Sequence, residues 1–146
     1  MGTLRDIMGD EKRREALIED ALKAIDAEVG DKGGLGGMAI KAAYGMVKGI
    51  APGIMVKLLG NLLPGFLDAL QPFYDRAKES GADLKAAFEG RRPEIANALL
   101  SVTDGRAAGA SSGPLKKGYE KLRPSAQKHV EQAVPRLAEL LGRHAG

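Results

Sequence analysis

Cysteine and tryptophan are absent from the chain, and its 146 residues include only three phenylalanines, three tyrosines and two histidines. The lack of cysteine excludes disulfides, thiolate nucleophiles and zinc sites built on cysteine. The scarcity of aromatic residues disfavours a β-sandwich, whose core normally uses β-branched and aromatic side chains. The apolar content comes mainly from alanine, leucine, isoleucine, valine and methionine, which suits a single helical domain of this length.

The sequence patterns of catalysis and metal binding are also missing. The two histidines, His129 and His144, lie fifteen residues apart, without the Glu-x-x-His or His-Glu-x-x-His spacing of metal sites. Residues 109–113, GASSG, match the letters of Gly-x-Ser-x-Gly around Ser111, but no strand pattern precedes them as a nucleophile turn requires. The glycines of residues 33–37 lack the Gly-Lys-Ser/Thr ending of a phosphate-binding loop. We therefore expect a protein that is not an enzyme and that uses no metal and no cofactor.

The first twenty residues do not resemble a targeting signal. They contain several acidic side chains and no long apolar run, so we expect no secretory signal. The sixth residue is Asp6, where the myristoylation pattern requires serine or threonine. Together with the lack of cysteine, these features predict a cytoplasmic protein.

Acidic residues are missing from residues 32–67, where every charged side chain is a lysine. The total charge of +3 combines alternating blocks: −4 over residues 1–31, +4 over 32–67, −2 over 68–104 and +5 over 105–146. Blocks of opposite charge can attract each other within the folded protein or face water. Neither arrangement by itself implies a charged partner.

Apolar residues recur with helical spacing along most of the chain, and the alternation typical of strands is nearly absent. Asp10 is a suitable N-cap for the first helix, and Gly30 ends it. Pro64 and Pro124 each begin a new helix in this interpretation, because proline fits the first helical turn. The expected fold is all-α, an irregular or orthogonal bundle of six to eight short helices in a single domain.

Composition divides this domain into four parts. Residues 1–31 form an acidic N-terminal helix, residues 35–104 the central helical core, residues 105–113 a flexible loop, and residues 114–146 the basic C-terminal helices. The loop is expected because its second half, AGASSG, consists of small and polar residues.

Glycines recur at almost every fourth residue in the segment 33–53. Residues four apart share one side of a helix, so Gly37, Gly45 and Gly49 leave a strip of backbone without side chains. We expect the helix of residues 36–50 to lie at the centre of the bundle, where a second helix packs closely along this glycine edge.

Lys41, Lys48 and Lys57 are candidates for contacts with an anionic surface. They lie opposite leucine, isoleucine, methionine and valine side chains in the region 36–63, and such a basic amphipathic segment is typical of a helix on a membrane surface. Residues 36–50 span about 22 Å as a helix, too short to cross the ~30 Å hydrocarbon core of a membrane. The alternative is a buried central segment whose lysines reach outward to water.

Lys117, Lys121 and Lys128 are candidates for contacts with nucleic-acid phosphates. They recur at spacings of four and seven near the C-terminus, although Pro124 can break the helix between them. Tyr119 lies among them, but it also fits an apolar stripe of the same helix. A solvated helix surface is the alternative.

Four segments resemble a known family. They read GGMAIKAAY (36–44), LLPGFLDALQPFY (62–74), LLSVTDGRAA (99–108) and KKGYEKLRPSAQKHVEQAVPRL (116–137). In these segments the chain is similar to a family of uncharacterised small helical proteins found mainly in actinobacteria. The resemblance implies an all-helical cytoplasmic domain without an assigned activity, and no catalytic or binding residue carries over from it.

The sequence therefore leaves three binding functions open. The first is a protein-interaction or self-association module, which predicts a defined oligomer or a protein partner. The second is a peripheral membrane or lipid-binding protein that uses the region 36–63, which predicts binding to anionic vesicles. The third is nucleic-acid binding through Lys116–Lys128, which predicts a gel shift that weakens with salt.

Overall fold

The computed structural model describes residues 4–31, 34–109 and 113–145, which form helices and no strand. A short 3-10 helix, η1, precedes six α-helices. The bounds are η1 Leu4–Met8, α1 Glu11–Asp31, α2 Gly34–Lys48, α3 Ile54–Ser80, α4 Leu84–Glu89, α5 Arg92–Ala108 and α6 Gly113–Ala145. The expected fold class, a single all-α domain, is confirmed.

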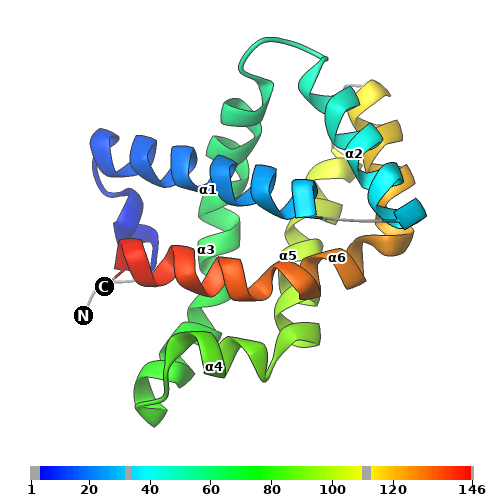
Figure 1. Ribbon diagram of the computed structural model, residues 1–146. Coiled ribbons are helices and arrows are strands. Elements are labelled where there is room, and N and C mark those ends of the chain that lie inside the picture. The colour runs from blue at the N-terminus through cyan, green and yellow to red at the C-terminus, as the bar shows by residue number, and fades with distance from the viewer. Residues whose placement is uncertain (1–3, 32–33, 110–112, 146) are drawn as a thin grey trace.

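The helices form two layers that cross each other (Figure 1). In the front layer, α1 and the C-terminal part of α6 run in opposite directions and contact each other. Behind them, α3 and α5 pack together and cross this pair, and the short α4 packs against α6. α2 lies outside both layers, where it contacts the first part of α6 and also α1 and α3.

The core lies between the two layers and continues under η1 and α4. Its largest fully buried side chains are Phe88, Leu4, Leu17, Leu70, Ile95, Leu141 and Val134. η1 is fixed to α3 by polar contacts as well: the backbone N–H of Leu4 donates to Gln71 at 2.6 Å, and Arg5 pairs with Asp68 at 2.7 Å. The first and last helices therefore share one core although they are far apart in the sequence.

Two of the helices are long, because α3 has 27 residues and α6 has 33. Pro64 and Pro124, where the sequence predicted new helices, both lie inside these continuous helices, so the helix starts predicted at these two prolines are wrong. A proline inside a helix removes one backbone hydrogen bond and favours a bend. Figure 1 shows that α6 bends between the part beside α2 and the part beside α1.

α5 continues to Ala108, so residues 105–108 are helical and the predicted loop 105–113 begins too early. Residues 110–112 of that prediction lie outside the described residues. Contacts with other helices hold the last turns of α5 in place: Arg106 donates a hydrogen bond to the backbone carbonyl of Asn61 on α3 at 3.1 Å.

The position of α2 differs from the expected one, because this helix lies at the edge of the molecule and not at its centre (Figure 1). Ala43 is buried against the rest of the protein, whereas Met38 is 67% exposed. α1, α3 and α6 contact α2 from the side of Ala43 and leave its opposite side open. Within the described ranges, no helix is both long enough and apolar enough to cross a membrane.

Candidate functional site

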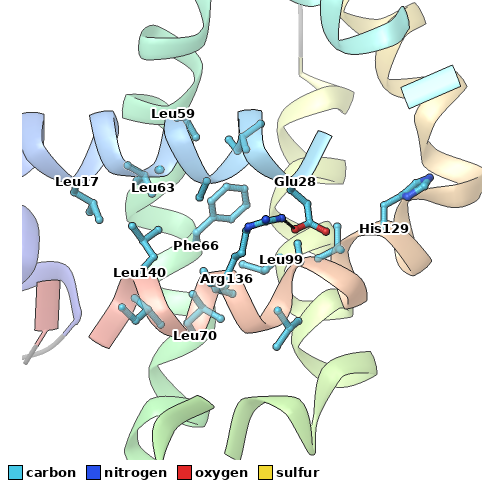
Figure 2. A pocket seen from close by; sticks show the side chains of 18 of the residues that line it. Leu17, Glu28, Leu59, Leu63, Phe66, Leu70, Leu99, His129, Arg136 and Leu140 are labelled. Carbon is cyan, nitrogen blue, oxygen red and sulfur yellow. Dashed lines mark hydrogen bonds and ion pairs between the residues drawn. The ribbon is translucent and has the colours of Figure 1, made fainter. Parts of the chain in front are cut away.

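A pocket of about 290 Å³ lies between α1, α3, α5 and the C-terminal part of α6 (Figure 2). Its lining is apolar except for Glu28, His129 and Arg136. The apolar lining residues are Leu17, Ala21, Ala24, Ile25, Val29, Ile40, Leu59, Leu63, Phe66, Leu67, Leu70, Leu99, Val130, Ala133, Val134, Leu137, Leu140 and Leu141.

The pocket is elongated and differs between its two ends. At one end the lining side chains are fully buried, and Leu17, Leu70 and Leu141 are each only 1% exposed. At the other end, Val29 and Val130 are half-buried. The lining residues of α1 extend from Leu17 to Val29, about 18 Å along the helix at 1.5 Å per residue. The pocket therefore opens near the C-terminal end of α1, and the fully buried leucines form its closed end, where little accessible space remains.

Arg136 lies at the mouth. Its side chain reaches from α6 past Phe66 toward α1 and forms ion pairs with Glu28 and Asp31 (Figure 2). Hydrogen bonds to Asp31 and Glu28 raise the pKa of the Arg136 guanidinium, so the group keeps its charge. A guanidinium has five N–H donors, and these two ion pairs need only two of them. The mouth can therefore also interact with a polar group of a ligand.

A second set of charges joins α1 to α6 near the closed end. Arg143 donates two hydrogen bonds to Asp20 at 3.0 and 3.1 Å, and His144 Nε2 lies 2.9 Å from the same carboxylate. The hydrogen bond from Arg143 and, to a smaller extent, the contact with His144 lower the pKa of Asp20 below its ordinary value. Ion pairs thus connect the two front helices at both ends of the pocket.

The chemistry of the lining suits binding. None of its side chains carries a hydroxyl, thiol or amine, and its two possible nucleophiles are the Glu28 carboxylate, which pairs with Arg136, and the His129 imidazole. In the part of the chain that the structure describes, no three histidine or carboxylate side chains come close enough to hold a metal ion. The pocket can remove an apolar ligand from water while Arg136 contacts the more polar end of that ligand.

The glycine edge predicted on α2 is not a helix contact at Gly45 or Gly49. A Cβ atom at Gly45 would meet nothing within 4 Å, and one at Gly49 would meet only carbonyl oxygens of α2, at 3.4 and 3.6 Å. Of the three predicted positions, only Gly37 is buried. The prediction fails because neighbouring helices pack against the opposite side of α2, where Ala43 and Val47 lie.

Helices approach closely at three other glycines, which the sequence analysis did not single out. A Cβ atom at Gly65 of α3 would lie 3.0 Å from Val102 of α5, and one at Gly118 of α6 would lie 3.5 Å from Val47 of α2. At Gly60 of α3 it would lie 2.9 Å from an arginine side chain of α1. These glycines are single and form no repeat. The sequence therefore indicates these contacts only through the position of each glycine inside an amphipathic helix.

The structure brings the two predicted lysine groups together. All six lysines are exposed, and the first part of α6 packs against α2. Five of them therefore lie at one end of the molecule: Lys41, Lys48, Lys57, Lys117 and Lys121. Lys128 lies further along α6, which continues through Pro124 without the break considered from the sequence.

The pocket itself was not predictable from the sequence. Helical spacing gave the apolar side of each helix, but a pocket depends on the distances between four helices. One local signal was present, since Arg136 stands between Val134 and Leu137 at the edge of an apolar stripe. A single charge in such a position is equally compatible with a surface ion pair.

The fold and the site define an all-helical domain that surrounds an apolar pocket with a charged mouth. The chain belongs to the family of unknown function DUF6918, whose model matches residues 4–145. This finding agrees with the resemblance seen in the sequence and assigns no activity. Searches among curated proteins and among solved structures found no significant match.

Proposed function

We propose that this protein binds a small apolar molecule in the pocket between α1, α3, α5 and α6. The observation that carries the proposal is a volume of about 290 Å³ with an almost entirely apolar lining. An unfilled apolar cavity destabilises a protein in proportion to its volume, and water does not fill such a cavity well. A ligand that occupies it gains the burial of its own surface and supports the surrounding helices.

The size of the pocket limits the ligand. At about 30 Å³ per non-hydrogen atom, the volume a water molecule takes in the liquid, the pocket holds about ten such atoms. Its extent along α1 favours an elongated ligand over a compact one. We therefore propose an unbranched alkyl chain of about eight to ten carbons, with its end group at the mouth beside Arg136.

A series of primary alkyl alcohols of four to fourteen carbons, studied by isothermal titration calorimetry, tests this proposal, because a neutral hydroxyl avoids the charges of Glu28 and Asp31. Each buried methylene contributes about 0.8 kcal/mol, so the dissociation constant should fall roughly fourfold per carbon. This gain in affinity should stop near ten carbons, because the pocket is then full. No binding, or an affinity that keeps rising up to fourteen carbons, contradicts a pocket of this size.

Two variants and a control locate the binding. Ala24 of α1 and Ala133 of α6 line the pocket, so Ala24→Phe and Ala133→Phe place an aromatic ring in the space proposed for the ligand. Each should abolish binding of the ten-carbon alcohol, while the protein remains helical by circular dichroism. Ala86→Phe makes the same change on the exposed side of α4 and should leave the affinity unchanged. Equal affinity in all three variants contradicts the pocket as the site.

We also propose that the protein acts in the cytoplasm by binding and without catalysis of its own. The lack of cysteine and a lining without hydroxyl, thiol or amine groups support this proposal. Occurrence mainly in actinobacteria rests on the resemblance of the sequence alone. Fractionation of cells that produce the protein tests the location, and recovery outside the cell would contradict it.

A further inference from the structure

The large apolar side chains that are strongly exposed lie on α2 and in the first turn of α3. Three large apolar side chains are strongly exposed in the described residues: Met38 at 67%, Met46 at 40% and Val56 at 49%. We call the exposed residues of α2, the residue that follows it and the first turn of α3 the outer α2 surface: Met38, Lys41, Ala42, Gly45, Met46, Lys48, Gly49, Val56 and Lys57. Apolar side chains that cluster on a surface mark an interaction site.

The outer α2 surface is also unobstructed. At 100° per residue, Met38, Ala42, Gly45 and Gly49 form a line along the exposed side of α2, with Lys41 on its flank. Nothing lies within 4 Å of a Cβ atom placed at Gly45. The backbone of α2 can therefore come close to a flat partner.

Positive charge dominates this end of the molecule. Residues 32–67 contain no acidic side chain, and one carboxylate of another helix, Asp26 of α1, pairs with Lys48 at 3.8 Å. In the described parts of the chain, no carboxylate forms an ion pair with Lys41 or Lys57. The neighbouring first part of α6 adds three exposed lysines: Lys116, Lys117 and Lys121.

We propose that the outer α2 surface docks on an anionic lipid bilayer. Met38, Met46 and Val56 enter the boundary between head groups and acyl chains, and the lysines contact lipid phosphates and carboxylates. α2 has 15 residues, about 22 Å of helix, so it lies on the bilayer and does not cross it. The proposal is independent of any ligand in the pocket.

Charge and polarity favour a bilayer over other occupants. A nucleic acid would use the lysines but leave the methionines and the valine in water. A second copy of the chain, related by twofold symmetry, would place lysines opposite lysines. A surface that offers negative charge and an apolar layer together satisfies both kinds of side chain.

Sedimentation with lipid vesicles tests the proposal. The purified protein is mixed with vesicles of phosphatidylcholine alone and with vesicles containing 30% phosphatidylserine, each at 50 and 500 mM salt. We expect binding to the anionic vesicles at low salt, and its loss at high salt and on neutral vesicles. No binding to anionic vesicles at 50 mM salt, or equal binding to both vesicle types, overturns the proposal.

Substitutions separate the two contributions. Lys41→Gln with Lys57→Gln should weaken binding about 25-fold, because each lysine near an anionic membrane contributes about fivefold. Lys12→Gln with Lys78→Gln removes the same charge from exposed positions on α1 and at the end of α3, and should change binding little. Met38→Ser with Val56→Ser keeps the charge and should also weaken binding. An equal loss of vesicle binding in the Lys41/Lys57 and Lys12/Lys78 double variants overturns the proposal.

The other candidate partners of the outer α2 surface, a nucleic acid and a second copy of the chain, predict different experimental results. A salt-sensitive gel shift with duplex DNA that depends on Lys41 and Lys57 but not on Met38 and Val56, without vesicle binding, identifies a nucleic-acid surface. A dimer in analytical ultracentrifugation that Met38→Ser disrupts identifies a second copy as the occupant. Either result overturns docking on a bilayer.

Discussion

Asp20 joins the two front helices through Arg143 and His144. Because the folded state lowers the pKa of this carboxyl below its ordinary value of 3.8, the ionised form stabilises the fold above that pH. The stabilisation is lost as the pH falls through the lower pKa of the folded state.

Asp20→Asn should therefore reduce the free energy of unfolding at pH 7 by about 1 kcal/mol, since the partners of the carboxylate are partly exposed. The difference between the two proteins should shrink when urea unfolding is repeated at pH values from 4 down to 2.5. A difference that stays constant over this range would show that the charge of Asp20 does not matter.

We expect added side chains to have opposite effects on stability at Gly45 of α2 and at Gly118 of α6. Gly45 is exposed inside a helix and has open space around it, so Gly45→Ala should stabilise the protein by about 0.5–1 kcal/mol. Gly118 is buried against Val47, so Gly118→Leu should destabilise it by about 1–3 kcal/mol through overpacking. Urea denaturation measures both changes, and a destabilised Gly45→Ala protein would mean that a partner helix covers α2.

At the scale of elements, the sequence predicted which residues face the core better than it predicted where helices begin and end. Asp10 caps α1 by accepting a hydrogen bond from the backbone of Arg13, as its position indicated. The prediction of a helix start at Pro64 was wrong although a proline–glycine pair fits such a start. The buried residues Leu59, Leu63, Leu67 and Leu70 keep helical spacing across Pro64, and tertiary packing of this stripe outweighs the local signal.

Pro72 lies inside α3 with its ring exposed, so its cost to the helix can be measured. Pro72→Ala restores a backbone donor toward the carbonyl of Asp68 and removes the steric conflict of the ring. It should raise the free energy of unfolding by about 1–3 kcal/mol. Pro93, at the first turn of α5, is the matched control, and Pro93→Ala should bring no gain. A loss of stability in Pro72→Ala would show that the fold requires a bend at this position.

At the scale of the whole molecule, the charge blocks of the sequence indicated in part which helices pack together. The acidic first block and the basic last block meet in the ion pairs between α1 and α6, which connect Glu28 and Asp31 with Arg136 and Asp20 with Arg143. The position of α2 was not predictable, because an apolar arc does not show from how many sides a helix is contacted. The pocket arises from the spacing of whole helices, which no single segment encodes.

The most direct test of ligand binding is a crystal structure of the protein with a ten-carbon primary alcohol that carries bromine at its far end. The anomalous signal of bromine should lie inside the pocket, on the side of Leu17, Leu70 and Leu141, with the hydroxyl near Arg136. A bromine located only on the surface, or a pocket that remains empty beside a bound ligand elsewhere, would contradict the proposed function.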